Sequence, residues 1–315
     1  MIREQEIRQV RERPAERRLL ARLLVLAAAV LWGTTGTAQA LAPGSADPAA
    51  VGGVRVLIGG LALLVLALLR GGLGRPGSWS RLATALAAAG VAAYQICFFS
   101  GVARTGVALG TIVTIGSSPA FAGLLGLLAR RERPEPGWGM ATALTVAGAA
   151  LLVLPGQEVG VDPRGVVLNL GAGAAYATFA VASKALMDAG RPPAAIMGLA
   201  FSGGALLLLP AVVTSDLTWL LQPRGMAVAL HLGLVATALA YLLFGRGLQG
   251  TPVTTAATLS LAEPLTAASL GLLLLGERLT ALGLAGAGLL FAGLVLLARP
   301  PGMRLRPSRG LPTDG

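Results

Sequence analysis

Apolar segments of about twenty residues recur along the whole chain, separated by short connectors rich in proline, glycine and charged residues. A helix of this length spans the hydrocarbon core of a bilayer. The alternation of apolar and polar residues over about ten positions, typical of membrane β-barrels, is absent from the sequence. The pattern therefore predicts an all-α integral membrane protein with ten transmembrane helices, at residues 22–41, 48–69, 82–101, 106–129, 138–155, 165–185, 194–213, 225–245, 252–275 and 281–298.

Composition agrees with this pattern. Of the 315 residues, 55% are hydrophobic and only 12% are charged, whereas about a quarter of the residues of a soluble domain are charged. The net charge of +11 would suggest nucleic-acid binding in a soluble protein, so the positions of the charges decide its meaning. The single cysteine, Cys97, excludes an internal disulfide and a cysteine-based metal cluster.

The basic residues gather on one side of the predicted membrane. Twenty of the 25 lysines and arginines fall in the N-terminal arm, in every second connector or in the C-terminal tail, four fall in the other connectors, and Arg55 lies inside a span. Cytoplasmic connectors carry an excess of basic residues, so both termini are predicted to be cytoplasmic. The arm is then a topology signal rather than a tail for RNA or lipid, and no nucleic-acid partner is expected. The arm, the first apolar run and Ala38-Gln39-Ala40 also imitate a cleavable signal peptide.

The second half of the chain repeats the first at an offset of about 145 residues. Each copy holds five predicted spans, an odd number, so the second copy must be inverted in the membrane. The first span belongs to the repeat, which argues against its removal as a signal peptide. Inverted repeats are the usual architecture of secondary transporters, with the binding site near the midplane between the halves. The predicted organisation is a basic cytoplasmic arm at 1–21, five-helix repeats at 22–155 and 165–298, and a cytoplasmic tail at 299–315. The matching pairs are Pro119 with Pro264, Glu132 with Glu277, Arg133 with Arg278, and Gly148 with Gly293.

Polar side chains are concentrated in the first, third, fourth, sixth, eighth and ninth spans, which correspond to one another in the two repeats. Such side chains are costly in lipid and face a protein interior or a wet cavity. We therefore expect a central cavity lined by these six spans, with the other four more peripheral. For any single hydroxyl, an interhelical hydrogen bond is the alternative interpretation. The candidates for contact with a substrate are Trp32, Thr35, Gln39, Tyr94, Ser118, Tyr176, Tyr241, Thr258 and Glu263.

Glu263 lies at the middle of the ninth span and is followed directly by Pro264. It is either a structural carboxylate at a helix break, or a group that contacts a cation or amine or couples transport to protons. The first repeat has Ser118 and Pro119 at the matching positions, so the halves differ chemically there. Both prolines are predicted to break their helices, because proline removes a backbone donor and clashes with the preceding turn.

Two further ionisable residues lie within spans. His231 is a second candidate for proton coupling, with a hydrogen-bonded histidine as the alternative. Arg55 either extends its head group to the membrane interface or pairs with an acidic residue or a substrate carboxylate. No catalytic residues, cofactor or metal site are expected, because the sequence has no phosphate loop, a single histidine and no nucleophile with a matching histidine and acid.

Four short motifs recur in a fixed order along the spans: LWG at Leu31–Gly33, RVLIGGLALL from Arg55 onward, AEPL in the ninth span and the GER that follows. In these motifs the chain resembles the drug/metabolite transporter superfamily, and within it the EamA-type bacterial permeases. The overall sequence is similar to the YddG-type exporters of amino acids. The resemblance implies an inverted five-plus-five helix fold, a central cavity, alternating access and export of small metabolites. The family's Glu-Pro pair corresponds to Glu263 and Pro264, whereas the first half has Ser118 instead.

These observations favour a secondary transporter that exports amino acids or similar small metabolites across the bacterial cytoplasmic (inner) membrane by alternating access. Its expected partners are a small-molecule substrate and the lipid bilayer, while the oligomeric state and the coupling ion are left open. The alternatives are an exporter of drugs, nucleosides or polyamines and, from another class, a channel or a membrane scaffold without transport. The prolines at the midplane and the twofold polar lining favour a transporter over a scaffold.

Overall fold

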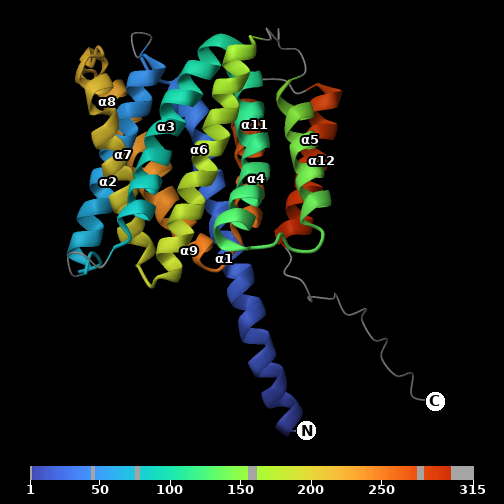
Figure 1. The fold of residues 1–315 in the computed structure, drawn as a ribbon. Coiled ribbons are helices and arrows are strands. Elements are labelled where there is room, and N and C mark those ends of the chain that lie inside the picture. The colour runs from blue at the N-terminus through green and yellow to red at the C-terminus, as the bar shows by residue number, and fades with distance from the viewer. Residues whose placement is uncertain (1, 44–46, 75–78, 155–161, 275–279, 299–315) are drawn as a thin grey trace.

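The computed structural model describes residues 2–43, 47–74, 79–154, 162–274 and 280–298, and these residues form helices joined by connectors, with no strand among them. The helices stand side by side in one bundle, and the first turns of α1 project beyond it (Figure 1). The first repeat contains α1 (Ile2–Ala40), α2 (Pro48–Leu69), α3 (Arg81–Thr105), α4 (Val107–Arg130) and α5 (Trp138–Val153). The second contains α6 (Pro163–Asp188), α7 (Pro193–Val213), η1 (Thr218–Leu221), α8 (Pro223–Leu230), η2 (His231–Leu239), α9 (Ala240–Gln249), α10 (Val253–Leu259), α11 (Ala262–Leu274) and α12 (Ala281–Ala298).

The helices correspond to the ten predicted spans. Within the described part of the chain, nine helical stretches are long and apolar enough to cross a membrane, and the remaining span is the shorter apolar helix α5. The eighth span consists of α8, η2 and α9, and the ninth consists of α10 and α11. α1 includes most of the predicted N-terminal arm, which is therefore a continuation of the first helix. Glu277, Arg278 and the tail at 299–315 lie outside the described residues.

Helix packing follows the repeat. α3 packs against α6, and its counterpart, the eighth span, packs against α1. α4 also packs against α6, while α11 packs against α1, and the pairs α2 with α7 and α5 with α12 each join a helix to its own counterpart. These contacts therefore come in equivalent pairs or join equivalent helices, as two repeats related by a twofold axis require.

Glycine permits the close approach of α5 and α12. A Cβ atom at Gly148 would lie 2.3 Å from the backbone nitrogen of Leu290, and one at Gly286 would lie 2.6 Å from that of Leu152. Small residues at such crossings allow the backbones to pack directly, which is how membrane helices associate without a hydrophobic driving force. This pair explains part of the abundance of glycine in the sequence.

The helix of the ninth span is interrupted between α10 and α11, beside Pro264. Proline cannot donate to the carbonyl of Ser260, and this carbonyl accepts from the backbone nitrogen of Glu263 at 3.1 Å instead. The tighter turn separates the two helices. The eighth span changes geometry as well, because η2 is a π-helical segment in which Thr237 Oγ1 donates to the carbonyl of Leu232 at 2.8 Å.

The predicted break at Pro119 is absent, because α4 continues through this residue without interruption. Membrane helices tolerate proline without a break. Pro119 leaves the carbonyl of Ile115 without its helical donor, and the hydroxyls of Ser117 and Ser118 donate to the preceding carbonyl, that of Thr114, at 3.1 and 2.8 Å. Matching prolines in the two repeats therefore have different structural effects.

Charged side chains tie several helices together at one end of the bundle. Arg22 of α1 is only 2% exposed, forms an ion pair of 2.7 Å with Glu135, and donates to the carbonyl of Leu297 in α12 at 2.7 Å. Glu135, in the connector between α4 and α5, also accepts from Thr255 Oγ1 of α10 at 3.0 Å. We call Arg22, Glu132, Glu135 and Lys184 the helix-end network. Its other contacts join Glu132 to the backbone nitrogen of Val253 at 2.8 Å, and Lys184 to the carbonyls of Leu248 and Gln249 at 2.7 and 2.8 Å.

Candidate functional site

A cavity lies between the two repeats, with about 50 Å³ of space in which a water-sized group fits. A second, smaller cavity shares Arg55, Tyr94, Tyr176 and Tyr241 with the first, so the two adjoin. The larger cavity is lined by Trp32, Thr35, Arg55, Tyr94, Ile115, Ser118, Tyr176, Tyr241, Ala257, Ser260, Leu261 and Glu263.

The cavity brings together seven of the nine residues that the sequence suggested for substrate contact. They come from six different spans, three in each repeat, as the distribution of polar residues predicts. The seven are Trp32, Thr35, Tyr94, Ser118, Tyr176, Tyr241 and Glu263.

Gln39 and Thr258 are not among the residues that line either cavity. Thr258 is fully buried, and its hydroxyl lies 2.9 Å from that of Thr142 in α5 and accepts from Trp138 Nε1 at 3.1 Å. It therefore makes the interhelical hydrogen bonds that were the alternative interpretation for a single hydroxyl. Gln39 lies in the last turn of α1.

Two helices that were expected to be peripheral also contribute to the cavities, and this expectation was wrong. Arg55 of α2 lines both cavities, and Phe201 of α7 lines the smaller one. α2 and α7 also pack directly against each other. A single charge within an apolar span was the available signal for Arg55, whereas nothing in the apolar sequence of α7 distinguishes Phe201.

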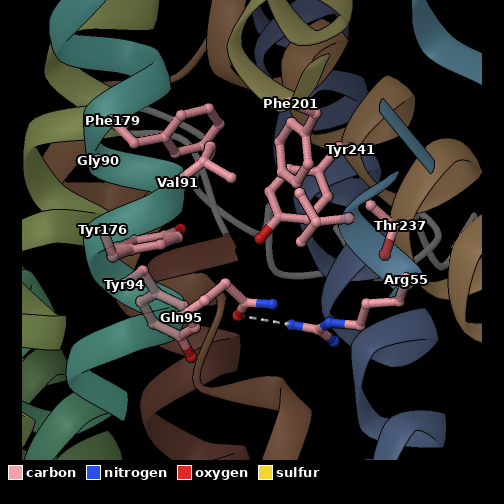
Figure 2. Close-up of a pocket in the computed structure, with 11 residues that line it drawn as sticks. Arg55, Gly90, Val91, Tyr94, Gln95, Tyr176, Phe179, Phe201, Thr237 and Tyr241 are labelled. Carbon is pink, nitrogen blue, oxygen red and sulfur yellow. Dashed lines mark hydrogen bonds between the residues drawn. The ribbon is translucent and has the colours of Figure 1, made fainter. Parts of the chain in front are cut away.

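Four aromatic rings, each from a different helix, line the larger cavity. The ring centroid of Tyr241 lies 4.1 Å from that of Phe201 and 4.8 Å from that of Trp32 (Figure 2 shows the first of these pairs). The ring of Tyr176 packs near Phe244, with 6.2 Å between centroids, and its hydroxyl lies 3.0 Å from that of Ser260. Such rings offer apolar surface together with faces that attract cations.

Arg55 is held beside the cavity by Gln95. Its Nη2 donates to Gln95 Oε1 at 3.4 Å, the contact drawn in Figure 2, and Gln95 Nε2 donates to the carbonyl of Gly52 at 2.8 Å. Because Gly52 and Arg55 lie on the same helix, α3 holds the arginine through a side chain that is itself anchored to α2. The guanidinium keeps further donors for another partner, since Nε is buried without a hydrogen bond among the described residues.

Glu263 lines the larger cavity at the start of α11. Within the part of the chain that the structure describes, its carboxylate has neither a hydrogen-bond partner nor an ion-pair partner within 4.0 Å. Its backbone closes the turn at Ser260, but its side chain takes no part in that bond. The structure therefore gives the carboxylate no role in holding the helix break together.

His231 lies apart from both cavities. Its Nε2 is 2.9 Å from the hydroxyl of Thr34 in α1, and the residue begins the π-helical segment η2. This arrangement is that of a hydrogen-bonded histidine between two helices. Among the described residues, no three histidine, cysteine or acidic side chains come close enough together to hold a metal ion.

The paired repeats and the polar cavity between them define a helical membrane transport protein. A model of the EamA-like transporter family matches residues 19–154 and, a second time, residues 163–299. The chain therefore belongs to the EamA-like transporter family, in agreement with the resemblance to drug/metabolite transporters, and it is not an enzyme.

Individual proteins support the same assignment. Over 279 residues the chain is 44% identical to the uncharacterized transporter YwfM of Bacillus subtilis (strain 168). The matched region covers 89% of this chain and 94% of YwfM. Over 152 residues the chain is 32% identical to the threonine/homoserine exporter RhtA of Escherichia coli (strain K12). This matched region covers 47% of this chain and 50% of RhtA. A solved structure described only as a crystal structure of a protein has a TM-score of 0.75 at 22% identity, over 89% of this chain and 97% of the other, and supports the fold.

Proposed function

We propose that this protein is a secondary transporter that exports amino acids or similar small metabolites from the cytoplasm. The observation that carries the proposal is the cavity between the repeats, which combines aromatic rings, hydroxyls, one arginine and one glutamate. Partial similarity to a threonine/homoserine exporter and to a probable amino-acid metabolite efflux pump of Salmonella typhimurium supports this substrate class. Drugs, nucleosides and polyamines are the rival substrates.

The proposed mechanism is alternating access. With both termini in the cytoplasm, as the basic residues predict, the helix-end network lies at the cytoplasmic end of the bundle. The network joins α1, α6, α9, α10 and α12 with the connector after α4, so these contacts must break when the cavity opens to that side. The interruptions in the eighth and ninth spans are suitable hinges, because a few residues at helix ends absorb such changes.

Flux measurements test the proposed function. Purified protein in proteoliposomes is expected to carry at least one neutral amino acid with saturable kinetics, and unlabelled amino acid inside the vesicles should accelerate entry of the labelled one. This acceleration separates a carrier from a channel, whose flux would not saturate or show exchange. Protein-free vesicles are the control, and drugs, nucleosides and polyamines complete the panel. If only these solutes are carried, or none, the amino-acid proposal fails.

We assign proton coupling to Glu263 rather than to His231. Glu263 lines the larger cavity. The other ionisable groups there are Arg55 of α2, Tyr94 of α3, Tyr176 of α6 and Tyr241 of α9. The ring of His231 lies outside this cavity, where it is hydrogen-bonded to Thr34. Glu263→Gln cannot exchange a proton at this position, so we expect its transport rate to lose the pH dependence of the wild type.

His231→Gln is the matched control for this experiment. It also removes a titratable group from a membrane span, and its amide nitrogen can take the place of Nε2 in the hydrogen bond to Thr34. We expect this variant to keep the pH profile of the wild type. An unchanged profile in Glu263→Gln, or a flat one in His231→Gln, would contradict the assignment.

A further inference from the structure

We propose that Arg55 and Glu263 together recognise a zwitterion, with Arg55 binding the carboxylate and Glu263 the ammonium group of one substrate molecule. The inference rests on the proposed transport function and specifies its substrate as a free amino acid with an uncharged side chain. It assigns separate roles to two residues on different helices, α2 and α11, which line the same cavity.

The two opposite charges face one cavity without forming a direct ion pair. No ion pair within 4.0 Å joins Arg55 to Glu263, and neither forms a salt bridge to any other residue that the structure describes. Charged groups within membrane spans are costly and usually pair with each other or mark a substrate pathway. A ligand that carries one charge of each sign would compensate both groups at once. A simple amine or a simple carboxylate would leave one of them uncompensated.

The cavity lining has unsatisfied donors for a carboxylate. Three donors on the cavity lining are buried without a hydrogen-bond partner among the described residues, namely Arg55 Nε, Trp32 Nε1 and Thr35 Oγ1. Trp32 is only 6% exposed, so its N–H has little access to water. Indole and guanidinium nitrogens can only donate, and an ionised carboxylate accepts up to about four hydrogen bonds. A bound carboxylate would therefore satisfy groups that the protein itself leaves unsatisfied.

The same lining has acceptors and ring faces for an ammonium group. Its carboxylate only accepts when ionised, and the hydroxyls of Ser260 and Tyr176 and the ring of Tyr241 line the same cavity. An ammonium group donates up to three hydrogen bonds and is attracted to aromatic faces. Because the cavity contributes one positive and one negative side chain, a substrate without net charge leaves no charge uncompensated.

Competition with altered substrates tests the proposal. The probes are L-threonine, L-threoninamide, which lacks the carboxylate, and N-acetyl-L-threonine, which lacks the ammonium group, or the same derivatives of whichever amino acid the flux panel shows to be carried faster. In the wild type, each derivative should inhibit flux about tenfold less effectively than the amino acid, since each loses one charge-assisted contact. Equal inhibition by all three would overturn the proposal without the need for any variant.

Two variants then assign the roles. Arg55→Gln should weaken binding of L-threonine and N-acetyl-L-threonine about tenfold, while threoninamide binds as before. Glu263→Gln should weaken binding of L-threonine and threoninamide about tenfold, while N-acetyl-L-threonine binds as before. Arg55→Lys retains the charge but not the planar fork, so it should keep part of the preference for the carboxylate. A structural role would weaken all three probes alike, and that result would contradict the inference. If no amino acid is carried at all, the proposed function itself fails, which is a different outcome.

Discussion

Glu135→Gln is expected to destabilise the protein by about 3 kcal/mol or more, because the change removes the carboxylate that compensates a buried arginine. Arg22 is 2% exposed and Glu135 19% exposed, and their side chains meet at 2.7 Å. The amide can still hydrogen-bond, but it carries no charge. Thermal unfolding in detergent can be monitored through the loss of monodisperse protein. The apparent melting temperature of the variant should be lower than that of the wild type by roughly 5 °C or more.

Asp162→Asn supplies the matched control, with the same exchange of a carboxyl group for an amide. Asp162 pairs with Arg104 at 3.5 Å, and both side chains are substantially exposed. Surface pairs of this kind contribute little to stability, and asparagine can replace aspartate as the cap of α6. We expect almost no change in the melting temperature of this variant. If Asp162→Asn is as damaging as Glu135→Gln, burial is not the reason for the effect.

The double variant Arg22→Met with Glu135→Leu tests the cause further. Replacement of a buried ion pair by apolar residues of similar volume is often neutral for stability, so the double variant should recover most of the loss seen with Glu135→Gln. A double variant that is less stable than the single one would indicate that the charges hold the helix ends together in a way that apolar packing cannot replace.

The arrangement of spans could be predicted from the sequence because it depends on properties that act locally. An apolar run long enough to cross a bilayer is helical wherever it lies, and α2, α7 and α12 follow directly from this rule. The cost of polar groups in lipid then predicts which spans face the cavity, and Trp32, Tyr94, Tyr176 and Tyr241 lie there. The internal repeat then predicted which spans of the first half correspond to which spans of the second.

Helix rotation and long-range partners could not be predicted in the same way. Neighbouring residues on a helix point about 100° apart, so the direction of a side chain depends on how its helix packs. α2 meets α7 where a Cβ at Gly60 would lie 2.8 Å from the backbone of Phe201, and Gln95 of α3 holds the side chain of Arg55. Likewise, the sequence shows Glu135 only as one of several charges in a connector. Its partner, Arg22, lies 113 residues away along the chain, and only the folded structure brings the two together.

Gly33→Ala is expected to reduce transport about tenfold or more, although alanine normally favours helix formation over glycine. Gly33 lies in α1 where this helix crosses the start of α11, and a Cβ there would lie 2.5 Å from Thr266 Cβ and 2.8 Å from the carbonyl oxygen of Glu263. A close-packed interior cannot absorb this methyl group without backbone movement. The movement falls on the residue that carries the cavity's only carboxylate among the described lining, so flux should fall more than expression does.

Gly36→Ala on the same helix distinguishes this effect from a general intolerance of α1 to substitution. A Cβ at Gly36 would meet no atom within 4 Å, and the residue is exposed. We expect this variant to transport at the rate of the wild type, measured in the same proteoliposomes and normalised to inserted protein. If Gly33→Ala transports equally well, α11 can shift without consequence, and the close approach of α1 is not what positions Glu263. If both variants lose activity, the sensitivity belongs to α1 as a whole rather than to its contact with the break in the ninth span.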